Sequence, residues 1–142
     1  MGADIKTVAR REIEEIFGQG NVALVDEIIA TDFVGYDPAQ PEPTRGREGV
    51  KQSAAGYRAA FPDLTCTVDQ QVVEGDTVAT RWTASGTHEG ELFGIAPTGK
   101  QATVTGISIS RIVDGQIVED YTNWDTFGLM VQIGVVPIPT TA

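Results

Sequence analysis

The hydrophobic pattern of this chain changes its period at Pro62, and this change limits the folds that the chain can adopt. Before Pro62, apolar residues recur at helical spacing, which predicts amphipathic helices. After Pro62, the period becomes twofold and turn residues recur, which predicts strands. Helices followed by a strand meander predict an α+β domain with the helices packed on one face of an antiparallel sheet.

The expected elements follow from this pattern. Helices are predicted at residues 5–17, after Asn21 and at 47–61, with a short strand at 32–36 and a last helical turn after residue 125. The first helix has Glu12, Glu14 and Glu15 mostly on its polar side, and the second has an inner face formed by Leu24, Val25, Ile28 and Ile29. Four longer strands are predicted at residues 64–73, 77–85, 102–112 and 116–125. Three prolines between residues 37 and 46 predict a surface loop that forms a rim or lid. A sheet that curls around the helices is expected to enclose a pocket.

Length and composition exclude several classes of protein. A chain of 142 residues supports one core, so we expect a single domain over residues 1–142. The net charge of −10 argues against nucleic acid as a partner. With Cys66 as the one cysteine and His88 as the one histidine, an internal disulfide and the common zinc spacings are excluded. No secretory signal or membrane span is recognised, so we expect a cytoplasmic protein.

Several segments, taken in order, resemble the SnoaL-like polyketide cyclases of the NTF2-like superfamily over about residues 8–137. These segments are DFVGYDP (32–38), GVK (49–51), YRAAFPDL (57–64), EGDTVATRWT (74–83), GTHEG (86–90) and RIVDGQIVE (111–119). The resemblance implies a cone-shaped α+β fold and an enzyme of lyase or isomerase type that needs no metal or organic cofactor. It also implies intramolecular aldol closure of an aromatic polyketide, with an aspartate near the end of the last long strand as acid/base. That position matches Asp125.

The chemistry of such a site can be stated for these residues. Tyr121, Asn123 and Asp125 share one face of the last strand, so on a concave face they would bring a phenol, an amide and an acid together. A carboxyl among apolar walls has its pKa raised by desolvation, which suits it to acid/base work. The other interpretation of Asp125 is a cap for the helical turn that follows.

Three further positions are candidates on the resemblance. His88 either reaches the pocket mouth, where it could act in catalysis, or is a solvated loop residue. Ser110 and Tyr36 stand where relatives often have histidine. A serine can donate a hydrogen bond but cannot act as a base near neutral pH, which argues against a His/Asp mechanism.

The remaining candidates are wall residues for a hydrophobic substrate. Arg81 and Trp82 are adjacent in a strand, so one faces inward and the other outward. An inward Arg81 would pair with Asp125 or stabilise an oxyanion, and an inward Trp82 would belong to the core or stack on a ligand. Tyr57 is expected in the pocket wall.

Three functions remain open. The first is a polyketide cyclase of the kind used in antibiotic biosynthesis. The second is a related hydroxylation, dehydratase or isomerase activity on a hydrophobic polycyclic substrate, and the third is a non-catalytic binding or dimerisation module. A homodimer or homotetramer is expected, because relatives commonly form one and because the outer sheet face is rich in Val, Ile and Thr.

Overall fold

The computed structural model describes residues 4–137, and its first element is a long amphipathic helix. This helix starts as α1 (Ile5–Arg11) and continues into a π-helical segment, η1 (Glu12–Phe17). The side chain of Asp4 caps it by accepting a hydrogen bond from the Lys6 amide. The helix buries Val8, Ala9 and Ile16. It therefore has the apolar face that its sequence predicts.

The second predicted helix is shorter than its apolar pattern suggests. A turn of 3₁₀-helix, η2 (Val22–Leu24), leads into α2 (Val25–Ile28), and β1 (Ile29–Tyr36) follows directly. Ile29 belonged to the predicted inner helix face, but its backbone is already extended, with φ of −106° and ψ of 128°. The prediction was wrong here because a β-branched residue buries itself equally well at the start of a strand.

The proline-rich loop leads from β1 to the longest helix. After residues 37–43 come a two-residue strand, β2 (Thr44–Arg45), and α3 (Gly46–Ala60). Gly46 has φ of +68°, a conformation that other residues rarely adopt, and it turns the chain from β2 into α3. The helix ends before Pro62, as predicted.

The second half of the chain forms four long strands and a short helix. They are β3 (Thr65–Glu74), β4 (Thr77–Thr87), β5 (Gln101–Val113), β6 (Gln116–Trp124) and α4 (Thr126–Gln132). Within residues 4–137 the six strands form one sheet in the order β2-β1-β6-β5-β4-β3. The predicted hairpins join β3 to β4 and β5 to β6 as antiparallel neighbours. The pairing of β1 with β6 is parallel, so the sheet is mixed at this edge.

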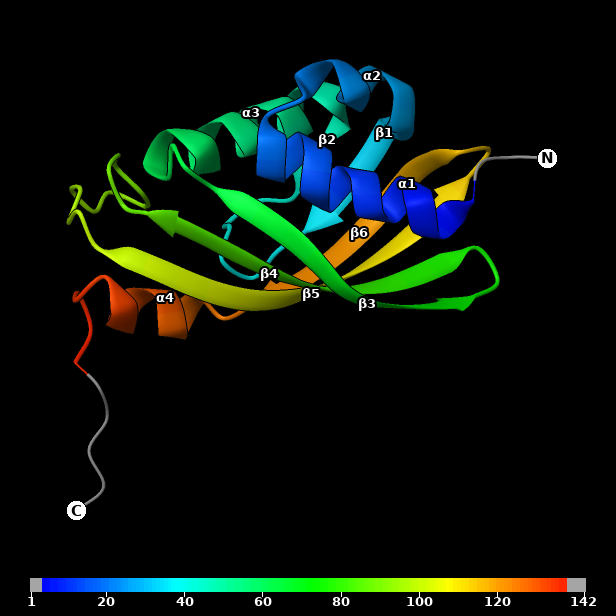
Figure 1. Cartoon of the computed structure of the whole chain (residues 1–142). Coiled ribbons are helices and arrows are strands. Elements are labelled where there is room, and N and C mark those ends of the chain that lie inside the picture. Colours follow the sequence, from blue (N-terminus) through cyan, green and yellow to red (C-terminus); the bar gives the residue numbers. More distant parts are fainter. Residues whose placement is uncertain (1–3, 138–142) are drawn as a thin grey trace.

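Helices α1, α2 and α3 lie on one face of a curved sheet. Figure 1 shows α1, α2 and α3 together above the concave face, with α4 following the end of β6. One cluster of buried residues joins the first helix, α2 and α3 to the base of the sheet. A second cluster joins the end of α3 to β5 and α4 around Phe61 and Leu129. This confirms the predicted α+β fold in which helices pack in a curved sheet.

An irregularity in β6 decides which of its side chains face inward. Arg111 pairs with Glu119, but the next residue of β5, Ile112, pairs with Ile117. Val118 is therefore an extra residue, a β-bulge that shifts the alternation of the strand. Ile117 is buried before the bulge and Asp120 after it. The inward residues at this end of β6 are consequently Asp120, Thr122 and Trp124.

Candidate active site

The concave face of the sheet encloses a pocket beneath the helices. Its cavity volume is about 180 Å³, and its walls come from η1, α3, β1 and the inner faces of β3 to β6. Most of the lining is apolar. Its apolar side chains include Phe17, Phe33, Phe61, Trp82, Val104 and Trp124. A substrate in this pocket would be held mainly by hydrophobic and aromatic contacts.

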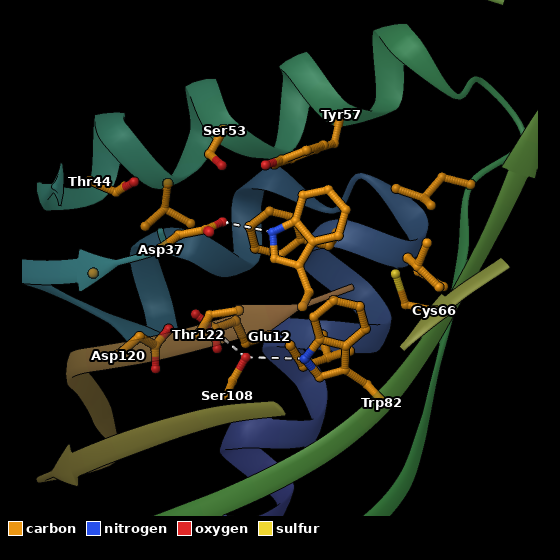
Figure 2. Close-up of a pocket in the computed structure, with 18 of the residues that line it drawn as sticks. Glu12, Asp37, Thr44, Ser53, Tyr57, Cys66, Trp82, Ser108, Asp120 and Thr122 are labelled. Atoms are coloured by element: carbon orange, nitrogen blue, oxygen red, sulfur yellow. Dashed lines mark hydrogen bonds between the residues drawn. The ribbon is translucent and has the colours of Figure 1, made fainter. Parts of the chain in front are cut away.

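Two buried carboxyl groups reach this pocket from different elements. Glu12 begins η1 and is 3% exposed, and Asp120 lies on β6 and is 7% exposed. Figure 2 labels both residues among those that line the pocket. Among the lining residues within the described part of the chain, none is a lysine, arginine or histidine. The pair therefore lacks the cation that usually accompanies a buried carboxylate.

The surroundings shift both acids in the same direction. Burial raises the pKa of Glu12 well above its usual value, and the neighbouring Asp120 raises it further. Burial also raises the pKa of Asp120, although the nearby side chains of Glu12 and Ser110 act in the opposite direction. The pair is therefore suited to hold one proton between its two carboxyl groups.

Asp120 is incompletely satisfied by the protein. Its Oδ1 atom is buried and has no hydrogen-bond partner among residues 4–137. Ser110 lies directly opposite on β5, is 1% exposed, and its Oγ also lacks a partner within the same residues. Buried polar atoms without partners are uncommon and mark sites of function or strain.

Hydroxyl groups form a short chain beside this pair. The Ser108 and Thr122 hydroxyls lie opposite each other on β5 and β6, with 2.8 Å between Oγ and Oγ1. Trp82 Nε1 donates to the same Ser108 Oγ at 3.1 Å. Figure 2 shows these contacts on the sheet side of the pocket. They fix the indole of Trp82 to Ser108 on β5, the strand next to the one that carries Asp120.

A second polar group lies where the proline-rich loop meets α3. Trp124 Nε1 donates to Asp37 Oδ2 at 3.0 Å, while Asp37 Oδ1 accepts from the Ala39 amide at 2.8 Å. Gln40 Nε2 donates to the Tyr57 hydroxyl at 3.0 Å. The loop is thus attached both to β6 and to α3. Asp37 and Gln40 of this loop also line the pocket, in keeping with the rim that its prolines predict.

Asp125 does not lie in the pocket, and its predicted placement in a water-poor chamber was wrong. It is exposed, and its side chain caps α4 by accepting a hydrogen bond from the Gly128 amide at 2.8 Å. Tyr121 and Asn123, on the same face, are exposed as well. The bulge at Val118 is the reason, because it turns the alternate residues 120, 122 and 124 inward.

His88 lies neither at the pocket mouth nor in solvent, so both predictions for it were wrong. Its side chain is fully buried and packs against Phe61 with 5.5 Å between ring centroids. Nδ1 lies 3.1 Å from the Thr98 hydroxyl. The backbone of His88 pairs with Lys100 beyond the ends of β4 and β5, which turns the imidazole into the core. It does not line the pocket.

The other predicted site residues divide between the two faces of the sheet. Trp82 faces the pocket, and Arg81 faces outward, where its Nε donates to Gln70 and its Nη1 lies 3.9 Å from Asp69 Oδ2. Tyr57 lines the pocket as predicted. Tyr36 lines its edge and stacks on Tyr121 with 4.9 Å between centroids.

Ser110 does not line the pocket directly but lies beside Asp120. Cys66 lines the pocket, and burial raises the pKa of its thiol to about 11, so it is not a thiolate near neutral pH. Within residues 4–137, no three His, Cys, Asp or Glu side chains come together as a metal site. No helix in that range has the length and apolar character needed to cross a bilayer.

Sequence reasoning missed both carboxyl groups. Glu12 was assigned to the polar side of its helix, yet it lies four residues after Val8 and four before Ile16, both buried. That spacing places it on the apolar face and could have identified it. Asp120 had no comparable signal, because the bulge that turns it inward is not visible in the alternation of the strand.

Comparison with known proteins gives the family of this chain. Residues 7–133 match the family model of the SnoaL-like polyketide cyclases. The chain belongs to the SnoaL-like polyketide cyclase family. It is therefore an enzyme of the cyclase type. The resemblance inferred from the sequence motifs is confirmed.

Individual relatives cover most of the chain. Nogalonic acid methyl ester cyclase from Streptomyces nogalater is 28% identical over 83% of this chain and 89% of its own. The crystal structure of IdmH from Streptomyces antibioticus, a proposed polyketide cyclase, is 38% identical, with a TM-score of 0.77 over 91% of this chain and 96% of its own. A Catenulispora acidiphila protein with a ketosteroid isomerase-like fold has a TM-score of 0.75 at 19% identity over 99% of this chain and 100% of its own, which bears on the fold alone.

Proposed function

We propose that this protein closes a ring in an aromatic polyketide by intramolecular aldol addition, with Asp120 as the acid/base. The observation that carries this proposal is the buried pair of Glu12 and Asp120 in an apolar pocket that no cationic side chain lines within the described residues. Asp120 takes the role that the sequence motifs had suggested for Asp125. No metal or organic cofactor is needed for this chemistry.

The first step removes a proton from the substrate. The ionised carboxylate of Asp120 accepts a proton from a carbon next to a carbonyl group, and the C–H electron pair moves toward the carbonyl oxygen to give an enolate. Because Asp120 is desolvated, its pKa is raised and its carboxylate is a stronger base than one in water. Glu12 remains protonated beside it, which prevents two adjacent negative charges.

The second step forms the ring. The enolate carbon attacks a second carbonyl carbon of the same molecule, so a C–C bond forms and the second oxygen becomes an alkoxide. Protonated Asp120 returns its proton to that oxygen, which regenerates the carboxylate. Substrate and product are isomers, and no other reactant is consumed. The aromatic walls contribute by folding the two ends of the substrate together in a water-poor space.

The lining of the pocket favours an uncharged, flat substrate. Trp82 and Trp124 offer large aromatic surfaces. The acidic side chains of the described lining are Glu12, Asp37 and Asp120. A free carboxylate on the substrate would be repelled, whereas a methyl ester would not. The Streptomyces nogalater relative is named as a cyclase of a methyl ester, and this supports a methyl ester as the substrate here.

Product identification tests this proposal. Purified protein is incubated with nogalonic acid methyl ester, the products are separated by chromatography, and their masses are measured by mass spectrometry. The expected product has the mass of the substrate and one additional ring, and it does not form with Asp120→Asn. Loss of water or gain of oxygen would contradict ring closure and favour dehydration or hydroxylation. The same product rate with Asp120→Asn would contradict the role of Asp120.

A further inference from the structure

Tyr57 is held rigidly at the helix side of the pocket. Its ring packs edge-on against two aromatic side chains, with centroid distances of 6.3 Å to Phe93 and 6.2 Å to Trp124, and these two rings lie 6.5 Å from each other. Figure 2 shows Tyr57 on α3 with its hydroxyl turned into the pocket, on the side opposite the strand that carries Asp120. A ring confined in this way keeps its hydroxyl at a fixed position.

The hydroxyl proton of Tyr57 is not donated to any group in the described part of the chain. Oη accepts a hydrogen bond from Gln40 Nε2 at 3.0 Å, and within residues 4–137 it donates none. A phenol has one proton to donate in addition to its acceptor capacity. Burial raises the pKa of Tyr57 to about 12, the Gln40 bond lowers it, and the charge of Asp37 raises it. The hydroxyl is therefore neutral and protonated near neutral pH.

We infer that Tyr57 donates a hydrogen bond to the substrate carbonyl oxygen that becomes negatively charged when Asp120 removes the neighbouring proton. This inference rests on the proposed acid/base reaction. The C–H proton goes to Asp120, the electron pair goes to the carbonyl oxygen, and Tyr57 keeps its own proton. Since no cationic side chain lines the pocket within the described residues, a neutral donor is what can stabilise this oxygen.

A spectroscopic experiment tests the donor without requiring turnover. The probe is 9-fluorenone labelled with ¹³C at its carbonyl, a flat aromatic ketone with no proton next to the carbonyl to remove. Binding is followed by tryptophan fluorescence, and the carbonyl stretch of the bound probe is measured by isotope-edited infrared spectroscopy. The variants are Tyr57→Phe, which keeps the aromatic ring, and Tyr121→Phe, which removes the same atom from the outer face of the sheet.

The expected result is a carbonyl stretch at lower frequency in the wild-type and Tyr121→Phe proteins than in Tyr57→Phe. With a reactive substrate, Tyr57→Phe should lower kcat by about 10²-fold while KM changes little. The same carbonyl stretching frequency in wild type and Tyr57→Phe would overturn the inference. Loss of the frequency shift in Ser53→Ala would also overturn it, because Ser53 carries the neighbouring hydroxyl on α3. Failure of the probe to bind the wild-type protein would also contradict it.

The outcomes separate this inference from the proposed reaction. Asp120→Asn should keep the lowered carbonyl frequency, because Tyr57 is still present. If Asp120→Asn turns over normally while the Tyr57→Phe shift appears, the reaction is wrong and the donor stands. If Asp120→Asn is inactive while Tyr57→Phe leaves the frequency unchanged, the reaction stands and the donor is wrong.

Discussion

The carboxyl groups of Glu12 and Asp120 lie side by side in the interior, one at the start of a π-helical segment and the other just after a bulge in β6. The bulge turns Asp120 toward the apolar pocket, whereas Glu12 faces the same pocket because it lies four residues from the buried Val8 and Ile16. π-Helical turns and β-bulges are both frequent at functional sites. The predictions below follow from this pair and from the walls around it.

The pH dependence of turnover should respond to Glu12. In the folded protein the Glu12 side chain lowers the pKa of Asp120, so Glu12→Met should raise it and move the acidic limb of the pH–rate profile to higher pH. Glu12→Gln retains a hydrogen-bond donor and should leave that limb nearly in place. Steady-state kinetics between pH 4 and 9 measures the shift, with circular dichroism as the control for folding. An acidic limb that is the same in Glu12→Met as in wild type would contradict the coupling.

The stability of the folded protein should fall as pH rises, to the extent that this pair contributes. Both folded-state pKa values lie above those of the unfolded chain, which are about 4. As pH increases above this range the unfolded chain loses protons first, so its free energy falls relative to that of the folded protein. The contribution is complete below about pH 4 and is lost as pH passes the raised values.

Glu12→Gln isolates this effect because it cannot ionise. Its free energy of unfolding relative to wild type should increase as pH rises above about 4, until wild-type Glu12 ionises in the folded protein, and be constant at lower pH. Urea denaturation at several pH values measures the difference. Asp63, whose pKa is lowered by hydrogen bonds from Thr87, is the same in both proteins and cancels. A difference that does not change with pH would contradict the burial of an ionisable pair.

The two tryptophans of the pocket depend on the absence of a side chain at Gly106. Gly106 pairs with Trp82 on one side and Trp124 on the other, and a Cβ built there would lie 2.8 Å from Trp124 Cβ and closer still to the Trp82 ring. Gly106→Ala should lower the free energy of unfolding by about 1–3 kcal/mol. It should also reduce kcat/KM by displacing Trp82. Denaturation and kinetics check both; an unchanged kcat/KM would show that Trp82 does not position the substrate.

His88 should matter for stability rather than for chemistry. It is fully buried against Phe61 and outside the pocket, so His88→Ala should leave a cavity and lower the free energy of unfolding by about 2–4 kcal/mol. The more conservative His88→Gln keeps much of the volume, and its kcat should stay within a few-fold of wild type. Loss of turnover in a stably folded His88→Gln variant would contradict this prediction and indicate a catalytic role for His88.

Much of the fold could be predicted because its signals are local. The change of period at Pro62, the hairpin turns at Gly75 and Gly115 and the end of α3 before Pro62 all depend on a few neighbouring residues. The parallel pairing of β1 with β6 joins residues that are far apart in the sequence, so no local pattern predicts it. The same is true of the division of buried residues into two clusters on either side of the pocket.

The site was harder to predict because one extra residue reverses an entire strand face. Counting by twos from the buried Ile117 places Tyr121, Asn123 and Asp125 inward, and only the unpaired Val118 moves Asp120 into their place. The expected homo-oligomer stays a prediction. The exposed side chains of Ile107 and Ile109 on the outer sheet face are the surface that it would cover.

The most direct test compares two aspartates five residues apart. Asp120→Asn and Asp125→Asn make the same chemical change, one in the pocket and one at the exposed cap of α4, where asparagine caps equally well. Turnover is measured for both variants under identical conditions after folding is verified by thermal denaturation. Asp120→Asn should lose about 10²- to 10⁴-fold in kcat, while Asp125→Asn should match wild type. Full activity in Asp120→Asn, with activity lost in Asp125→Asn, would contradict the account.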